Sequence, residues 1–178
     1  MVNLEVFSIL PIQWHVLAIV GTFIFTCVMP VIPIYVLIRK GEVSDMFIRS
    51  KEERTLPYFF SILSYTFWTV FLLKTLHLPL NIAIMGFGSI LSLILVMLIN
   101  FKWKISAHLC SMGALVGFVS GVSYVLAINS LIFIVILLCL SALVALSRIE
   151  LKAHSPLQTF AGFTVGFLCV FLSCFFMV

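Results

Sequence analysis

The chain has 178 residues, of which 63% are hydrophobic and 9% are charged, and its mean hydropathy is +1.31. These values exclude an ordinary soluble globular domain and predict an integral membrane protein. The formal net charge of +4 rests on few basic residues, and these stand at the ends of apolar runs. Nucleic acid is therefore not an expected partner.

Six apolar stretches are candidates to cross a bilayer, which takes roughly 20 residues in a helix. In chain order they run over about 14–38, 57–73, 79–100, 107–128, 130–146 and 157–178. They lack the alternating pattern of membrane barrel strands. The sequence therefore predicts an all-α, polytopic bundle of six transmembrane helices and a single membrane domain over 1–178. The first span is expected to be retained because it lacks the features of a cleaved secretory signal.

The charged residues fall mainly on one face of the predicted bundle. Helix parity places the connecting segments at about 40–57, 101–108 and 147–158 together on this face. Nine of the ten basic residues lie in or beside them: Arg39, Lys40, Arg49, Lys51, Arg54, Lys102, Lys104, Arg148 and Lys152. Two interpretations stay open. One is the positive-inside rule, which marks a cytoplasmic face, and the other is a basic pocket for an anionic headgroup.

The five cysteines all lie inside apolar runs, and the sequence has no CxxC or HExxH pattern and no carboxylate cluster. The cysteines are therefore predicted to be packing residues. Neither a metal nor another cofactor is expected.

Glycines repeat every four positions in two of the predicted helices. They are Gly113, Gly117 and Gly121 in the fourth helix and Gly162 and Gly166 in the sixth. Such spacing lets helix backbones approach closely in a membrane. We therefore expect these two helices, which begin beside His108 and His154, to pack together.

Three polar segments of the charged face carry groups suited to phosphate chemistry: KEERTLP (51–57), KISAH (104–108) and SRIELKAHSPLQ (147–158). Cleavage of a phosphate ester without a metal needs donors around the phosphoryl oxygens, a nucleophile, and an acid for the leaving alcohol. Arginine and histidine supply these functions. Taken singly, the same residues also fit interfacial histidines, snorkelling anchors and a solvated charge run.

The third segment also contains a helix start. Ser155 followed by Pro156 is typical of an N-cap and a first helical position. His154 is therefore expected just before a helix N-terminus, where free N–H groups favour an anion. Gln158, four residues further on, is placed to reach the His154 imidazole.

At these residues the chain resembles the type 2 phosphatidic acid phosphatase (PAP2) family, in its membrane lipid phosphatase branch, which is related to the vanadium haloperoxidases. The family signature is Lys-x6-Arg-Pro, then Pro-Ser-Gly-His, then Ser-Arg-x5-His-x3-Asp. The third motif matches from Ser147 through Arg148 to His154, with Gln158 in place of the aspartate.

The other two motifs match less completely. In the second, Ser106 and His108 match, whereas Ile105 and Ala107 replace proline and glycine. In the first, Arg54 matches, proline follows only at Pro57, and Phe47 stands where the family has lysine.

The resemblance implies a role for each matched residue. His154 attacks phosphorus to give a phosphohistidine, and His108 protonates the leaving group and then activates water. The phosphate oxygens are bound by Arg54, Arg148 and Ser106, with the N–H of Ala107, and Ser147 belongs to the same motif. Lys51 is our proposed substitute for the missing lysine, and Gln158 is expected to orient the His154 imidazole without supplying charge.

Two functions stay open on this basis. One is a metal-independent integral membrane phosphatase acting on a lipid phosphate or diphosphate. The other is a catalytically impaired PAP2-like protein that binds or transports lipids. The expected partners are a lipid phosphate and membrane lipids, and the expected location is the bacterial cytoplasmic membrane. The positive-inside rule places the charged face in the cytoplasm, whereas many bacterial members of the family work on the outer face.

Overall fold

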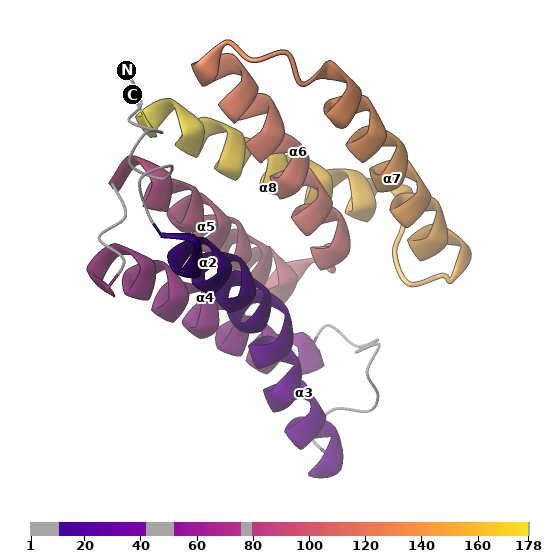
Figure 1. The fold of residues 1–178 in the computed structure, drawn as a ribbon. Coiled ribbons are helices and arrows are strands. Elements are labelled where there is room, and N and C mark those ends of the chain that lie inside the picture. The colour runs from indigo at the N-terminus through magenta and orange to yellow at the C-terminus, as the bar shows by residue number, and fades with distance from the viewer. Residues whose placement is uncertain (1–10, 42–51, 76–79, 178) are drawn as a thin grey trace.

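The computed structural model describes residues 11–41, 52–75 and 80–177 (Figure 1). Within these ranges the chain is helical, and six helices are long and apolar enough to cross a membrane. This confirms the predicted all-α bundle of six membrane-spanning helices.

The first span is a continuous helix with three parts, α2 (Ile12–Phe23), the π-helix η1 (Ile24–Val28) and α3 (Met29–Arg39). The remaining elements are the 3-10 turn η2 (Glu52–Arg54), α4 (Thr55–Thr75), α5 (Leu80–Lys102), α6 (Ala107–Leu126), α7 (Leu131–Glu150), α8 (Pro156–Cys174) and the closing 3-10 turn η3 (Phe175–Met177).

Two predicted boundaries need correction. The fifth span continues to Glu150 instead of ending near 146, so Ser147 and Arg148 occupy the last turn of α7 and not a loop. The last span begins at Pro156 and its α-helix ends at Cys174, before the predicted end at 178. The apolar runs alone placed the first of these boundaries too early, because polar residues in a last helical turn resemble a loop.

The parallel helices α6 and α8 form the tightest contact of the bundle, as the glycine repeats predicted. A Cβ atom added at Gly113 would meet the backbone of Phe163, and one added at Gly166 would meet the backbone of Cys110. Because backbone atoms cannot yield as a flexible side chain does, only glycine permits this approach. The close packing brings the starts of α6 and α8 together, where the Ser106 N–H donates to the Gln158 carbonyl oxygen at 3.3 Å.

The first span packs against α4. The hydroxyl of Ser64 donates to the Phe25 carbonyl oxygen at 2.5 Å, and that of Tyr65 donates to the Thr26 carbonyl oxygen at 3.3 Å. These bonds reach the π-helical stretch, where the regular backbone hydrogen bonding of an α-helix is interrupted. The Trp68 ring stacks on Phe25 with 4.9 Å between centroids.

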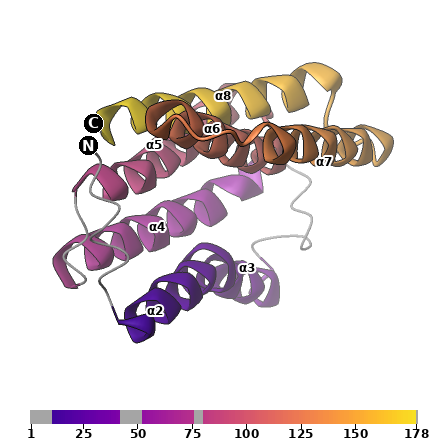
Figure 2. The same cartoon turned by 45° about the horizontal axis from the view of Figure 1, so that its top comes forward.

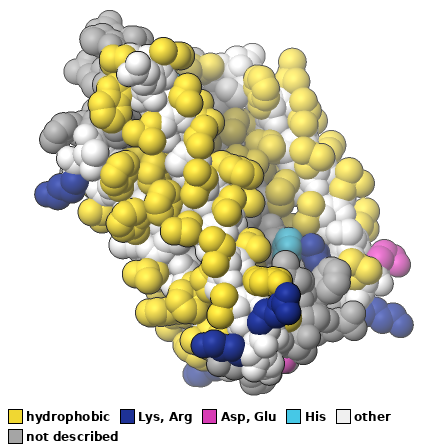
Figure 3. Space-filling model, turned by 60° about the horizontal axis from the view of Figure 1, so that its bottom comes forward, with side chains coloured by type: hydrophobic (Ala, Val, Ile, Leu, Met, Phe, Trp, Pro, Cys, Tyr) yellow, Lys and Arg dark blue, Asp and Glu magenta, His cyan; other side chains and the backbone are white. Residues whose placement is uncertain are grey.

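The helices form successive layers. Figure 2 shows α4 and α5 between the first span and the group of α6, α7 and α8. In Figure 3, hydrophobic side chains cover the surface of the spans, and most of the visible Lys and Arg side chains gather at the lower end of the molecule around a histidine. This distribution agrees with a charged face at one end of a membrane-spanning bundle.

Candidate functional site

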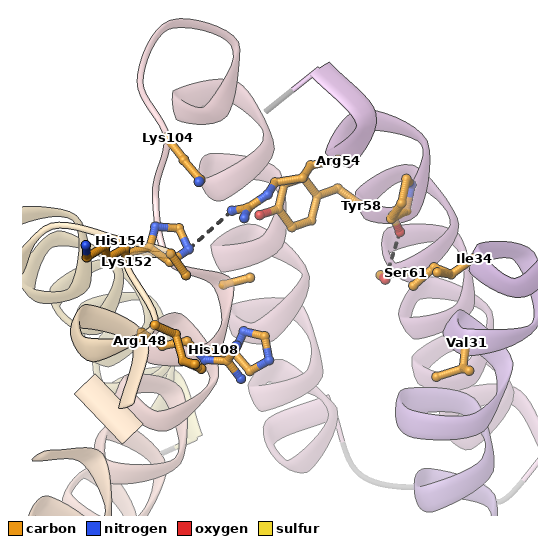
Figure 4. Close-up of a pocket in the computed structure, with 14 residues that line it drawn as sticks. Val31, Ile34, Arg54, Tyr58, Ser61, Lys104, His108, Arg148, Lys152 and His154 are labelled. Atoms are coloured by element: carbon orange, nitrogen blue, oxygen red, sulfur yellow. Dashed lines mark hydrogen bonds between the residues drawn. The ribbon is translucent and has the colours of Figure 1, made fainter. Parts of the chain in front are cut away.

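A cavity of about 670 Å³ opens at the charged end of the bundle. It is bounded by α3, by the starts of α4 and α6, and by the α7–α8 connection. The described residues that line it are Val31, Ile34, Arg54, Pro57, Tyr58, Ser61, Lys104, Ala107, His108, Arg148, Leu151, Lys152, Ala153 and His154. In Figure 4 the cationic side chains and both histidines lie on one side, and Val31 and Ile34 lie on the other.

His154 enters the cavity from the short connection between α7 and α8. The Arg148 carbonyl oxygen accepts the N–H groups of Ala153 at 3.0 Å and His154 at 3.2 Å. Lys152 has a φ of 51°, in the left-handed region, which turns the chain sharply at this point. The turn therefore returns His154 to the end of α7, where its backbone contacts the Arg148 carbonyl group.

The hydrogen bonds of His154 define its tautomer. Its Nε2 atom lies 3.3 Å from Nη1 of Arg54, and its Nδ1 atom lies 3.2 Å from Oε1 of Gln158. A guanidinium only donates, so Nε2 accepts through its lone pair. The ring proton is therefore on Nδ1 and is donated to Gln158, which leaves Nε2 as the basic nitrogen.

Gln158 is itself held by the cap of α8. The Oε1 atom of Gln158 accepts the Ser155 backbone N–H at 3.1 Å. The backbone N–H of Gln158 donates to the Ser155 hydroxyl oxygen at 3.4 Å. A backbone N–H only donates, so the amide atom that faces it is the oxygen. The capping box thus presents the Gln158 oxygen, and not its NH₂ group, to the imidazole. The predicted N-cap and first helical position of α8 are confirmed.

The surroundings of His154 hold it in the neutral form. The side chain is 7% exposed. Burial and the nearby positive charge of Arg54 lower the pKa of His154 from 6.5 to about 4, against a smaller opposing effect of the Gln158 hydrogen bond. Lys104 and His108 lower the same pKa further. At neutral pH the imidazole is therefore uncharged and its Nε2 lone pair is available.

The cavity is strongly cationic. Arg54, Lys104, Arg148 and Lys152 line it, and none of the described lining residues is acidic. Desolvation and the positive charge of Arg54 lower the pKa of Lys104. The Nε atom of Arg148 is buried without a hydrogen-bond partner in the described part of the chain. An unpartnered buried donor is costly, so this arrangement favours a bound anion.

The structure brings together most of the residues predicted for the site. His154, His108, Arg54, Arg148 and Ala107 all border one cavity. They come from η2, from the start of α6, and from the end of α7 with the connection that follows it, three segments that are far apart in sequence. Gln158 lies directly behind His154 and contacts its ring.

Two predicted phosphate-binding residues have other positions, and a third lies outside the described residues. Ser106 is fully buried beside the cavity, and its hydroxyl oxygen caps α6 by accepting the Leu109 N–H at 3.4 Å. Ser147 is exposed in the last turn of α7, where its hydroxyl donates to the Val144 carbonyl oxygen at 2.8 Å. Neither lines the cavity. Lys51 lies outside the described residues.

Four further polar residues, Tyr58, Ser61, Lys104 and Lys152, border the cavity although the sequence did not predict them as site residues. Lys104 and Lys152 belong to the polar segments but to none of the matched motif positions. Tyr58, which is 7% exposed, stands one helical turn after Arg54, and Figure 4 shows its hydroxyl directed toward that guanidinium. The i to i+4 spacing of Arg54 and Tyr58 was the available signal in the sequence.

Comparisons with known proteins leave the family open. No family model, curated protein or solved structure matches the chain. Among the described residues, no three His, Cys, Asp or Glu side chains form a group that could hold a metal ion. The likeness to the PAP2 family therefore stays a prediction that rests on the three motifs.

Proposed function

We propose that the protein is an integral membrane phosphatase that hydrolyses a lipid phosphate or diphosphate through a phosphohistidine at His154. The observation that carries the proposal is the state of this histidine. It is buried and neutral, its Nδ1–H is bound by Gln158, and its basic Nε2 faces a guanidinium in a cationic cavity. A neutral imidazole with one oriented lone pair is what nucleophilic attack on phosphorus requires.

The two sides of the cavity support an amphiphilic substrate. Arg54, Arg148 and the lysines offer donors and positive charge to a phosphate group, as electrostatic catalysis of phosphoryl transfer requires. Across the cavity, Val31 and Ile34 of α3 form an apolar wall that fits a hydrocarbon chain. A soluble phosphate would use only the first side.

In the first step, Arg54 releases Nε2 of His154 and binds the phosphate oxygens together with Arg148. The Nε2 lone pair forms a bond to phosphorus, and the bond from phosphorus to the lipid oxygen breaks. That oxygen takes the bond electrons and a proton from His108, which has to be protonated for this step. The phosphorylated ring keeps its Nδ1–H, and the resulting positive charge is stabilised by the Gln158 oxygen.

In the second step, neutral His108 takes a proton from a water molecule as the water oxygen attacks phosphorus. The phosphorus–nitrogen bond breaks, and its electrons return to Nε2 of His154. Inorganic phosphate leaves, and both histidines are restored to their starting protonation states. The proposed steps need no metal, because the cations of the cavity balance the phosphoryl charge.

A second candidate function has one observation in its favour. In the described structure, Arg54 is hydrogen-bonded to the very nitrogen that would attack phosphorus, at 3.3 Å. A protein in which this contact persists with ligand bound would hold a lipid phosphate without cleaving it. Such a protein would be a PAP2-like lipid-binding or transport protein.

The test is phosphate release by the purified protein from phosphatidic acid, phosphatidylglycerol phosphate and polyprenyl diphosphate, with and without a metal chelator. We expect phosphate release, and the chelator should leave it unchanged. His154→Ala should abolish release. His15→Ala is the control and should retain release, because His15 lies in α2 and does not line the cavity. Stoichiometric binding of these lipids with no release from any of them would establish the second function instead.

The covalent intermediate has its own test in His108→Ala. An aryl phosphate has a leaving group that departs without a proton, so only the second step needs His108. We expect this variant to accumulate label from a nitrophenyl phosphate on His154, in a bond that acid cleaves and base does not. Label on any other residue would refute the assigned nucleophile.

A further inference from the structure

A second cavity of about 420 Å³ lies inside the membrane-spanning part of the bundle. It is bordered by the first span, α4, α5, α6 and α8, and it opens partly to the surface of the bundle. Its apolar lining includes Leu72, Met85, Leu93, Ala114, Phe118 and Val170. Trp68, which is 4% exposed overall, forms part of the wall.

The hydroxyl groups of this cavity are largely satisfied by the protein itself. The hydroxyl of Thr26 donates to the Thr22 carbonyl oxygen at 2.6 Å, and that of Ser89 donates to the Met85 carbonyl oxygen at 3.1 Å. Ser111 donates in the same way to Ala107 at 3.2 Å. A hydroxyl that donates its proton to a carbonyl oxygen of its own helix has no donor left for a ligand. Such side chains present mainly methyl and methylene groups and a weak acceptor oxygen to the cavity. The cavity therefore suits hydrocarbon better than a ligand that needs strong polar partners.

The same faces of α4 and α6 line both cavities. On α4, Ser61 lines the first cavity, and Tyr65, one turn deeper, lines the second. On α6, His108 lines the first, and Ser111 lines the second. The two cavities thus border neighbouring turns of the same faces of α4 and α6.

We propose that this inner cavity binds the hydrocarbon chain of the ligand whose phosphate occupies the cationic cavity. The inference rests on the proposed function for the headgroup, and it places the chain inside the bundle instead of in the surrounding lipid. The apolar lining, the satisfied hydroxyls and the shared faces of α4 and α6 all support a chain as the occupant. Filling the inner cavity should therefore weaken binding of long-chain phosphates and leave short-chain ones unaffected.

Trp68 provides a direct probe of occupancy. The sequence has three tryptophans, and Trp14→Phe with Trp103→Phe leaves Trp68 as the only fluorophore of this kind. We would titrate this protein in detergent with phosphatidic acid that carries bromine atoms on its acyl chain. Bromine quenches tryptophan on contact, so we expect saturable quenching of Trp68. A brominated neutral lipid of the same chain length should quench far less.

The matched variants are Ala114→Phe, which fills the inner cavity, and Ala142→Phe, which places the same side chain on the exposed surface of α7. Quenching should be lost in the first and kept in the second. Ser89→Leu narrows the cavity from α5 and replaces Ala114→Phe if that variant does not fold. Equal quenching in filled and unfilled cavities would overturn the proposal, as would equal quenching by the neutral lipid.

Phosphate release measured on the same samples separates the two proposals. Quenching without release from any lipid would refute the phosphatase and retain the chain site. Release without quenching of Trp68 would refute the chain site and retain the phosphatase.

Discussion

The Gln158 amide oxygen lies 3.2 Å from Nδ1 of His154 and is fixed in that orientation by the Ser155 backbone N–H at 3.1 Å. In serine proteases, replacing the aspartate beside the catalytic histidine with asparagine costs on the order of 10⁴-fold, because the wrong tautomer is selected. Here the helix cap removes that ambiguity, since only the oxygen can face the Ser155 N–H. An amide in this position orients the ring as a carboxylate does, but it adds no negative charge.

The first prediction concerns this acceptor. Gln158→Ala removes a hydrogen bond that becomes charge-assisted when His154 is phosphorylated, so phosphate release should fall by about 10- to 100-fold. Gln158→Glu keeps an acceptor and adds charge, so it should restore orientation and raise the pKa of His154. Steady-state phosphate release measures the first effect. Turnover by Gln158→Ala equal to that of the unaltered protein would remove Gln158 from the site.

A second prediction concerns the protonation of His154 and needs no turnover. Burial and Arg54 lower the pKa of this group to about 4, so its ring resonances in an NMR titration should move near pH 4. Arg54→Gln should raise the midpoint only part of the way toward 6.5, because burial is the larger cause and remains. The His154 resonances are assigned as those that are missing from the spectrum of His154→Gln. A midpoint near 6.5 in the unaltered protein would contradict the neutral, desolvated imidazole.

The same shift predicts how stability depends on pH. Above pH 6.5 the imidazole is neutral in both folded and unfolded chains, so it contributes nothing. Between pH 6.5 and about 4 the unfolded chain binds a proton that the folded chain does not, so stability falls as the pH falls. The midpoint of thermal unfolding in detergent should drop more steeply over this range in the unaltered protein than in His154→Gln. Parallel curves for the two proteins would refute the linkage.

Much of the fold followed from hydropathy and spacing, because a bilayer leaves a helical bundle few alternatives. The glycine repeats also identified the α6–α8 contact, since the spacing encodes which face is small. The site was predictable to the extent that its residues belong to short local motifs. His154, Gln158 and Ser155 belong to one helix cap, and a helix cap can be predicted from a few consecutive residues.

What the sequence did not reveal depends on distant neighbours. Tyr58 reaches the cavity because α4 starts beside the α7–α8 connection, and Val31 and Ile34 do so because α3 packs on α4. Ser147 matches its motif position, yet α7 continues past it and leaves the side chain exposed. Motif spacing fixes residue order, whereas helix length and packing decide which side chains face the cavity.

A further prediction tests the packing that assembles the site. In Gly166→Ala the new Cβ would meet the Cys110 carbonyl group and the Ala114 backbone nitrogen, so α8 must move away from α6. We expect a loss of about 1–3 kcal/mol in the free energy of unfolding, reduced slightly by the better helix propensity of alanine. Unfolding in detergent mixtures measures it, and Ala142→Leu on exposed α7 is the control. Unchanged stability in Gly166→Ala would show that the two helices are not in such close contact.

The last prediction concerns Arg148, whose side chain lines the cavity. Its buried Nε atom has no hydrogen-bond partner among the described residues, and its carbonyl oxygen holds the His154 connection. Arg148→Ala keeps that backbone contact and removes only the guanidinium. Binding of orthovanadate, a phosphate analogue, should weaken by about 10- to 100-fold, as expected for losing hydrogen bonds to a charged group. Arg148→Lys should recover part of the binding, because it restores charge without the planar fork.

Arg39→Ala is the matched control for Arg148→Ala. Arg39 is exposed and does not line the cavity, and its Nε donates to the Tyr35 hydroxyl at 2.9 Å. Calorimetric titration with orthovanadate measures all four proteins, and undiminished affinity in Arg148→Ala would exclude this arginine as a phosphate ligand.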